Sequence, residues 1–336
     1  MKLAYFYSFY LFSLLLISAC SKSTDNSAEN ETPRTVRLEN WLQNADFEEI
    51  TVTSGRWAYE DIVFNPNGTG ALLDDDNRIF YSYDQGKTWE QKLKISGQTI
   101  NCIALKPNAE QIFIGGNSLG EAYGAKFWVY DTPKNGTSSL NYQAEAEVSN
   151  TRDLINHNFV RASWNGDGSV YASFGRSNYK DGFFGNITPD GRKIFIRRTP
   201  SFSRILDREP SRQPSYCAGF YIKNNSEQTT LCTYEYSTSG LTNILAAYYS
   251  TSKGSGNSWF NISANWKAGL VYHIGQDKTG EKSIWVSQAN RLFYNGQETI
   301  NYKNIQGNLL CAAIDQDDYV WVGTDRGLFK SKEPIP

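Results

Sequence analysis

The side chains that could recognise a ligand gather in short polar loops, each of which follows the second strand of a repeated unit of strands. These loops mix acidic, basic and aromatic residues. Aromatic rings beside hydrogen-bonding groups suit a sugar or a peptide. The alternative is that they are solvated loop positions. The candidate ligand-binding residues are Asp75, Tyr123, Arg176, Tyr179, Arg291, Asp325 and Arg326.

The sequence has few residues arranged as a catalytic or metal-binding site. His157 and His273 are isolated, and no HExxH or CxxC string is present. The acids Asp74–Asp76 could offer oxygen ligands to Ca²⁺, but successive side chains of an extended backbone point apart. We therefore expect no metal and no cofactor, and we favour a protein without catalytic activity.

Two pairs of cysteines stand out by position. Cys217 and Cys232 lie symmetrically about Asn224–Asn225, so a two-residue turn would place them opposite each other on paired strands. Both a disulfide and two free thiols fit that spacing. Cys102 and Cys311 occupy equivalent early positions in two of the repeats, and we expect them to be small buried hydrophobic residues.

Composition limits the classes of protein and partner. Among 336 residues, 33 Lys and Arg face 35 Asp and Glu, which leaves a net charge of −2 and no basic excess to neutralise phosphates. We therefore expect no nucleic-acid partner. An aromatic content of 14% together with 27 Gly favours strands joined by turns over helical bundles.

The elements that position the candidate loops recur along the chain. Each unit has an apolar strand, an Asn/Asp/Gly turn, a second strand, a polar loop and an aromatic third strand. Six copies are visible, and Pro66 and Pro107 lie at the same point of the first two. Such a repeat without a helical period predicts an all-β fold, a β-propeller with one blade per copy. The alternative is a β-sandwich built from the same hairpins.

Six copies predict six blades, with five or seven as the alternatives. The last copy ends after its third strand and would leave a sheet edge unpaired. We predict that Thr35–Leu38, or a strand close to it, supplies the missing outer strand and closes the ring. Residues 36–336 then form a single β-propeller domain, and the candidate loops meet at one mouth of it.

The hairpin at residues 82–89 matches the pattern S-x-D-x-G-x-T-W. It resembles the Asp-box of BNR-repeat propellers such as sialidases. In such a hairpin an Asp can accept N–H groups of its own turn, Gly supplies a positive φ and Trp packs between blades. The matching residues are Ser82, Asp84, Gly86, Thr88 and Trp89.

Two further stretches limit what this resemblance implies. Ser252–Trp259 keeps the frame with Gly254 in place of the Asp, and Val320–Phe329 is similar to the repeats of periplasmic sensor propellers of two-component regulators. Sialidases also carry an Arg-Ile-Pro near the first strand. It is absent here, and the nearest string, Ser203–Leu206, lacks the proline. The resemblance therefore implies a fold and not sialidase activity.

The first residues form a targeting segment. Residues 3–19 carry no charge, follow Lys2 and end in Leu16–Cys20, which resembles the lipobox of bacterial lipoproteins. The resemblance implies removal of a signal peptide, residues 1–19, and lipidation of Cys20, followed by a flexible polar tether over 20–35. An ordinary signal peptide with an incidental cysteine and a single-pass helix are the alternatives.

The sequence therefore predicts a lipoprotein of the bacterial cell envelope, held to the outer membrane by its lipid. Its propeller is expected to bind a glycan, peptide or protein partner without catalysis. The alternative is a glycan-active hydrolase with a pair of carboxylates on the same loops, which would need the two groups about 5 to 9.5 Å apart.

Overall fold

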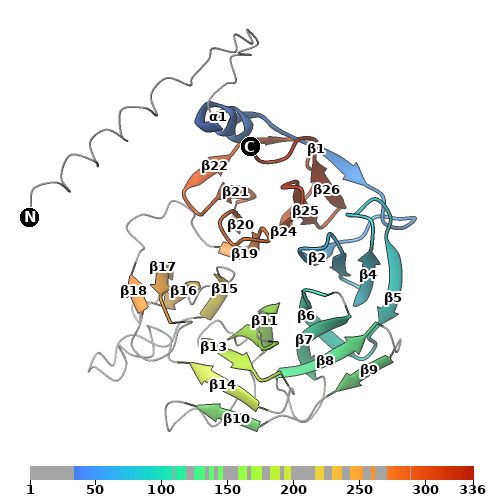
Figure 1. Ribbon diagram of the computed structural model, residues 1–336, viewed down its shortest axis with the longest axis vertical. Helices are drawn as coiled ribbons and strands as arrows, with labels where there is room; N and C mark the ends of the chain where they lie inside the picture. The colour runs from blue at the N-terminus through green and yellow to red at the C-terminus, as the bar shows by residue number, and fades with distance from the viewer. Residues whose placement is uncertain are drawn as a thin grey trace, which may run out of the picture. The chain divides into compact units, whose positions relative to one another are not determined.

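The strands of the chain assemble into sheets arranged around a central axis (Figure 1). The computed structural model describes residues 34–108, 110–118, 125–132, 136–139, 143–146, 158–164, 168–175, 182–189, 193–197, 216–222, 229–236, 243–252, 259–261, 271–287 and 289–336. The chain divides into a unit of residues 1–37 and a compact unit of residues 38–336, and the fold described below is that of the second unit.

The described residues form six sheets. The first three sheets contain β2 (Tyr59–Phe64), β3 (Gly70–Asp74), β4 (Arg78–Ser82) and β5 (Glu90–Lys94); β6 (Gln98–Leu105), β7 (Gln111–Ser118), β8 (Ala125–Asp131) and β9 (Gly136–Ser139); and β11 (Asn158–Trp164), β12 (Val170–Gly175), β13 (Gly182–Ile187), β14 (Lys193–Arg197) and β10 (Gln143–Ala146). The other three contain β15 (Tyr216–Ile222), β16 (Thr229–Tyr236), β17 (Asn243–Ser250) and β18 (Trp259–Asn261); β19 (Val271–Gln276), β20 (Ser283–Ser287), β21 (Arg291–Tyr294) and β22 (Glu298–Ile300); and β24 (Leu309–Ile314), β25 (Val320–Thr324), β26 (Leu328–Ser331), β1 (Ala45–Ile50) and β23 (Tyr302–Lys303).

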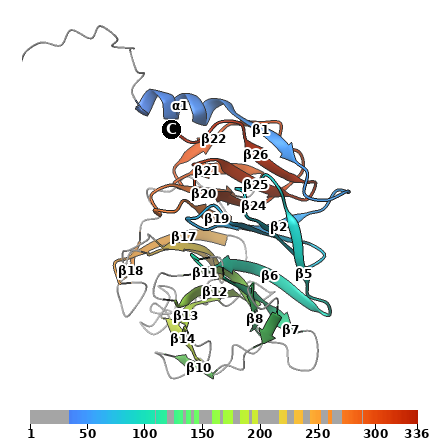
Figure 2. The same cartoon turned by 45° about the vertical axis from the view of Figure 1, so that its right-hand side comes forward.

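The first strand of each sheet lies nearest the axis. These inner strands contact one another in the order β2, β6, β11, β15, β19, β24 and back to β2. Figure 2 shows β19, β24 and β2 side by side from a second direction. The fold is a β-propeller, as the repeat predicts.

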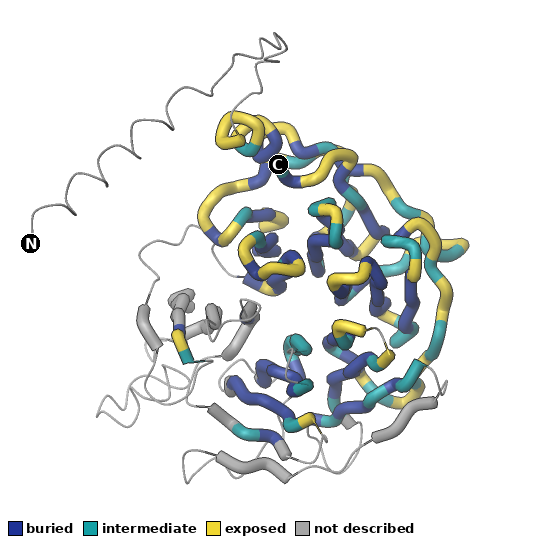
Figure 3. Tube along the Cα trace, viewed as in Figure 1, coloured by how far each residue is buried: buried dark blue, intermediate teal, exposed yellow. Residues whose placement is uncertain are grey.

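The hydrophobic core lies between neighbouring sheets. One cluster joins the first and second sheets through residues such as Leu73 and Ile103, and another joins the first and last sheets through Leu72 and Trp321. Buried residues follow the inner and second strands in Figure 3, while exposed residues concentrate on the turns. The sheets whose side chains are described are therefore stabilised mainly by burying apolar surface against their neighbours.

The start of the described chain differs from the prediction. Thr35–Leu38 is not a strand but part of the helix α1 (Arg34–Asn44). Trp41 and Leu42 are buried in the core, and such neighbouring apolar residues suit one helix face. The strand that pairs antiparallel with β26 is β1, which follows the helix directly.

Candidate functional site

All six inner strands carry a β-bulge at the same point. The register against the second strand shifts between Tyr59/Asp61 and at the matching place in the other five sheets. A bulge leaves an extra residue without its ladder partner. The extra residues are Glu60, Asn101, Val160, Ala218, Tyr272 and Leu310.

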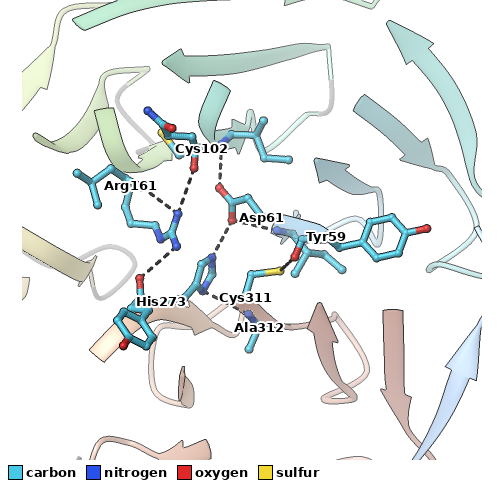
Figure 4. A network of polar contacts seen from close by, with 12 residues as sticks. Tyr59, Asp61, Cys102, Arg161, His273, Cys311 and Ala312 are labelled. Atoms are coloured by element: carbon cyan, nitrogen blue, oxygen red, sulfur yellow. Dashed lines mark hydrogen bonds and ion pairs between the residues drawn. The ribbon is translucent and has the colours of Figure 1, made fainter. Parts of the chain in front are cut away.

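Arg161 donates hydrogen bonds to backbone carbonyl groups of bulged residues. Its Nη1 donates to the carbonyl oxygens of Asn101 at 3.2 Å and Val160 at 2.9 Å, and its Nη2 donates to that of Tyr272 at 3.1 Å (Figure 4). All three acceptors are extra residues of bulges. Since Tyr272 belongs to β19, this arginine of β11 reaches past β15, the strand between them.

Asp61 accepts hydrogen bonds from backbone N–H groups. Its Oδ1 accepts from the N–H of Ile62 at 2.9 Å, and its Oδ2 accepts from the N–H of Ile103 on β6 at 2.9 Å. His273 Nε2 lies 2.7 Å from Oδ1. The aspartate is 2% exposed and the histidine 3%. A buried carboxylate is tolerated here because donors surround it.

The hydrogen bonds of His273 assign its proton. The N–H of Ala312 lies 3.4 Å from Nδ1, which therefore accepts, so Nε2 carries the proton and donates to Asp61. Burial lowers the pKa of His273, the positive charge of Arg161 lowers it further, and Asp61 opposes both. The imidazole is thus neutral at pH 7 and ties β19 to β2 across β24 (Figure 4).

A cavity of about 350 Å³ lies beside this network on the axis. Residues of all six inner strands line it, among them Asp61, Arg161, Phe220 and His273. Its rim includes Pro66, Pro107 and Lys278, which belong to the turns after β2, β6 and β19. This volume falls within the usual range of small-molecule sites.

The four candidate ligand-binding residues that the structure describes do not line this cavity. Asp75, Arg291, Asp325 and Arg326 are exposed, and they lie where β3 or β25 ends or where β21 begins. Successive connections of an antiparallel sheet alternate between its two ends, so these four residues belong to the opposite end of the propeller. Tyr123, Arg176 and Tyr179 lie outside the described residues.

One of those four residues has structural partners. The carboxylate of Asp325 accepts from the backbone N–H and from the side-chain amide of Asn308, both at 2.7 Å. These bonds fasten the β25–β26 loop to the segment before β24. Whether Asp75, Arg291, Asp325 and Arg326 bind a ligand stays a prediction.

The hairpin between β4 and β5 is held by its own side chains. Asp84 Oδ1 accepts from the Thr88 N–H at 2.9 Å and Oδ2 from the Thr88 hydroxyl at 2.7 Å, while Ser82 Oγ accepts from the Gly86 N–H at 2.7 Å. Gly86 has a φ of 79°, and Trp89 packs edge-on against Trp321 of the last sheet with ring centroids 6.1 Å apart. These contacts hold the hairpin together and pack it against the last sheet.

The cysteines divide into two cases. Cys102 and Cys311 are free and fully buried, as expected, and burial raises the pKa of both thiols. The predicted register of the other pair is wrong, because the bulge in β15 places Cys217 opposite Thr233 and Cys232 opposite Gly219. The disulfide itself stays a prediction, since these two side chains are outside the described set.

Several other sequence predictions fall outside what is described. Cys20, His157 and Gly254 are among the residues not described. Among the described residues, no helix is long and apolar enough to cross a membrane, and no three His, Cys, Asp or Glu side chains are grouped to hold a metal ion.

The sequence analysis missed Asp61, Arg161 and the role of His273. Asp61 and Arg161 directly follow the extra residues of their bulges, but nothing in the sequence announces a bulge. A charged residue inside an otherwise apolar first strand is the one signal that could have found them.

Comparison with known proteins identifies the class but no family. No family model and no curated protein matches the sequence. Among solved structures, a luciferin-regenerating enzyme is 9% identical with a TM-score of 0.55, covering 85% of this chain and 95% of that one. A regucalcin, a calcium-binding protein from Agrobacterium tumefaciens, is 11% identical with a TM-score of 0.54, covering 87% and 98%.

A third neighbour is larger than this chain. It is the extracellular domain of a putative hybrid two component system from B. thetaiotaomicron, 12% identical with a TM-score of 0.45. The match covers 86% of this chain but only 40% of that one. The chain is a β-propeller, and identities this low establish the fold alone.

Proposed function

We propose that the protein is a lipid-anchored binding β-propeller of the bacterial cell envelope, and that its ligand occupies the axial cavity. The ligand is a glycan or a segment of a peptide or protein partner. The observation that carries this proposal is the cavity itself, because every inner strand contributes to its wall. Wall residues that lie on strands are held more rigidly than residues on loops.

A binding role is favoured over catalysis by how the buried polar groups are used. Asp61 and His273 direct their hydrogen bonds to each other and to backbone N–H groups of three inner strands, not to a nucleophile. A general base needs a hydrogen-bond position open toward substrate. The buried thiols have raised pKa values and are poor nucleophiles.

The proposal includes six blades, closed by the N-terminal strand β1. The six sheets of the described chain, their six matching bulges and the cyclic order of inner-strand contacts support that count. Pairing of β1 with β26 from Phe47↔Ser331 to Ile50↔Leu328 supports the closure. The Ser82–Trp89 hairpin, with its bonded Asp84, supports kinship with Asp-box propellers.

Anchoring to the outer membrane through Cys20 rests on the sequence Leu16–Cys20. The test is detergent phase partitioning of the protein expressed with its leader in a bacterium. We expect the wild type in the detergent phase and Cys20→Ala in the aqueous phase. A wild type that partitions into water would exclude the lipid anchor without touching the binding proposal.

Binding in the cavity is tested with the purified propeller on glycan and peptide arrays. Ser163 lines the cavity, so Ser163→Trp should fill it while Ser163→Ala should leave it open. We expect wild type and Ser163→Ala to bind the same array members and Ser163→Trp to lose them. A folded Ser163→Trp variant that binds unchanged would remove the cavity from the proposal.

One observation favours glycan hydrolysis as the second candidate. Burial raises the pKa of Glu60, Arg161 opposes this, and the carboxylate of Asp75 adds to the rise. A carboxyl group of raised pKa near a second carboxylate suits a general acid. The test is release of reducing sugar from array-positive glycans. Activity that Glu60→Gln abolishes would replace binding by hydrolysis.

A further inference from the structure

Two residues that line the cavity each have a buried side-chain nitrogen with no hydrogen-bond partner among the described residues. These nitrogens are Nε of Arg161 and Nε1 of Trp164, and both residues belong to β11. Each carries one N–H and can only donate. A buried donor without an acceptor costs about 1 to 3 kcal/mol, so its persistence points to an acceptor that the protein itself does not supply.

The guanidinium of Arg161 adds a third donor. It has five N–H groups. Its hydrogen bonds to Asn101, Val160 and Tyr272 use three of them, which leaves one N–H on Nη2 besides that on Nε. Among the described residues Arg161 forms no ion pair within 4.0 Å. Its hydrogen bonds go to carbonyl oxygens, while its charge also opposes the rise that burial causes in the pKa of the nearby Glu60 carboxyl group.

The acidic groups of the cavity, in contrast, are already satisfied. Asp61 accepts three hydrogen bonds. Asp277 accepts from the Thr279 hydroxyl at 2.5 Å and from the N–H groups of Glu281 and Lys282 at 2.9 and 3.1 Å. The cavity therefore has spare donors next to a positive charge, while its carboxylates are occupied.

We propose that the cavity binds the terminal carboxylate and the apolar or aromatic last side chain of the peptide partner, held through Arg161 and Trp164. This inference rests on the proposed function and adds the chemical class of the ligand. An ionised carboxylate accepts hydrogen bonds and donates none, which matches the spare donors. Phe64, Leu105 and Phe220 supply apolar wall for the side chain. A dianionic phosphate is disfavoured because Asp61 and Asp277 would repel its second charge.

The experiment compares two probes of the same shape by calorimetry at neutral pH, phenylacetate and phenylacetamide. We expect phenylacetate to bind the wild type about tenfold more tightly, because a hydrogen bond to an ionised acceptor is stronger than one to a neutral acceptor. Arg161→Gln should abolish that preference. Arg56→Gln, which removes an exposed arginine that does not line the cavity, should keep it.

Arg161→Gln also removes bonds to three backbone carbonyls and could unfold the ring, so Trp164→Phe is the second variant. It keeps an aromatic ring and loses only the N–H. We expect it to weaken phenylacetate binding about threefold to tenfold, the worth of one hydrogen bond.

The outcomes separate this inference from the proposed function. Equal affinity for the two probes, or no binding of phenylacetate, overturns the carboxylate inference. The proposed function survives that result if Ser163→Trp still loses array binding. Conversely, a phenylacetate preference that depends on Trp164 supports a carboxylate site even if the array ligands bind elsewhere.

Discussion

Asp61 on the axis and Asp84 in the β4–β5 hairpin both accept hydrogen bonds from backbone N–H groups. The two differ in how far along the sequence their donors lie. Asp84 reaches Thr88, four residues along the chain, whereas Asp61 reaches Ile103 at a separation of 42 and His273 at 212. Asp61 is almost fully buried, while Asp84 is partly exposed. The first fastens sheets to one another and the second fastens one hairpin.

The difference teaches where a polar contact matters for stability. Water can replace the bonds of Asp84, so its loss exposes donors that are easily hydrated. Water has little access to the donors around Asp61, so they would stay buried and unpaired. We therefore expect equal chemistry at the two positions to have unequal energetic consequences.

The largest effect is expected for Asp61→Ala. Three buried donors lose their acceptor, and we expect the free energy of unfolding to fall by about 3 to 5 kcal/mol, measured by urea denaturation. Asp61→Asn keeps one acceptor oxygen and the shape, and should lose less. If Asp61→Ala lowered the free energy of unfolding by less than about 1 kcal/mol, this aspartate would matter no more for stability than an ordinary surface residue.

The next effect tests the hairpin through its packing. Gly86 has a φ of 79°, and a Cβ there would overlap the Trp321 ring. Gly97 has a φ of 70° with nothing within 4 Å of such a Cβ. We expect Gly97→Ala to cost about 1 kcal/mol from backbone strain and Gly86→Ala to cost a further 1 to 3 kcal/mol, roughly, from overpacking. Equal unfolding midpoints for Gly86→Ala and Gly97→Ala would show that the Trp321 ring moves aside without energetic cost.

Asp84→Ala should have a smaller effect than either. Burial raises the pKa of Asp84, but hydrogen bonds from Thr88 and Ser82 lower it more, so its carboxylate form is the bonded one. We expect a loss of about 1 kcal/mol in thermal unfolding near pH 7. Asp84→Asn, which retains an acceptor, should lie between. A loss as large as that of Asp61→Ala would contradict the comparison.

The smallest expected effect is a change with pH in the stability that His273 contributes. Because the pKa of His273 is lowered in the folded state, the unfolded chain binds the proton first as pH falls. The contribution of His273 is therefore complete above its ordinary pKa of about 6.5 and is lost progressively below it. The measurement is the melting temperature of wild type and His273→Gln between pH 7.5 and 5.

Other groups titrate in the same range, and burial raises the pKa of Glu60, which acts in the opposite direction. The difference between the two proteins isolates His273. We expect that difference to shrink as pH falls. A constant difference would mean that folding leaves the pKa of this imidazole unchanged.

The strand order of the propeller followed from the residues themselves. Runs such as Asp61–Phe64 and Gly70–Leu73, separated by an Asn-Pro-Asn-Gly turn, lie within β2 and β3. The turns work as their residues suggest, since Asn65 Oδ1 accepts from the N–H groups of Asn67 and Thr69 at 3.0 Å. Alternating apolar residues and side-chain-bonded turns are local properties, so a sequence expresses them directly.

Two local features were still misjudged. Thr35–Leu38, which lies in the helix α1, was expected to be a strand because the last sheet needed an edge partner. The register of Cys217 and Cys232 was displaced by a bulge. Both depend on how a segment packs against a neighbouring sheet, and packing overrides weak local preference.

By itself, the sequence determined the strands, their turns and the Asp84 hairpin, because each is made by residues a few positions apart. Only the tertiary structure decided the site. It brought Asp61, Arg161 and His273 from three different sheets to one axis, where bulges leave backbone groups in need of partners. That meeting depends on ring closure, and closure is a property of all the sheets together.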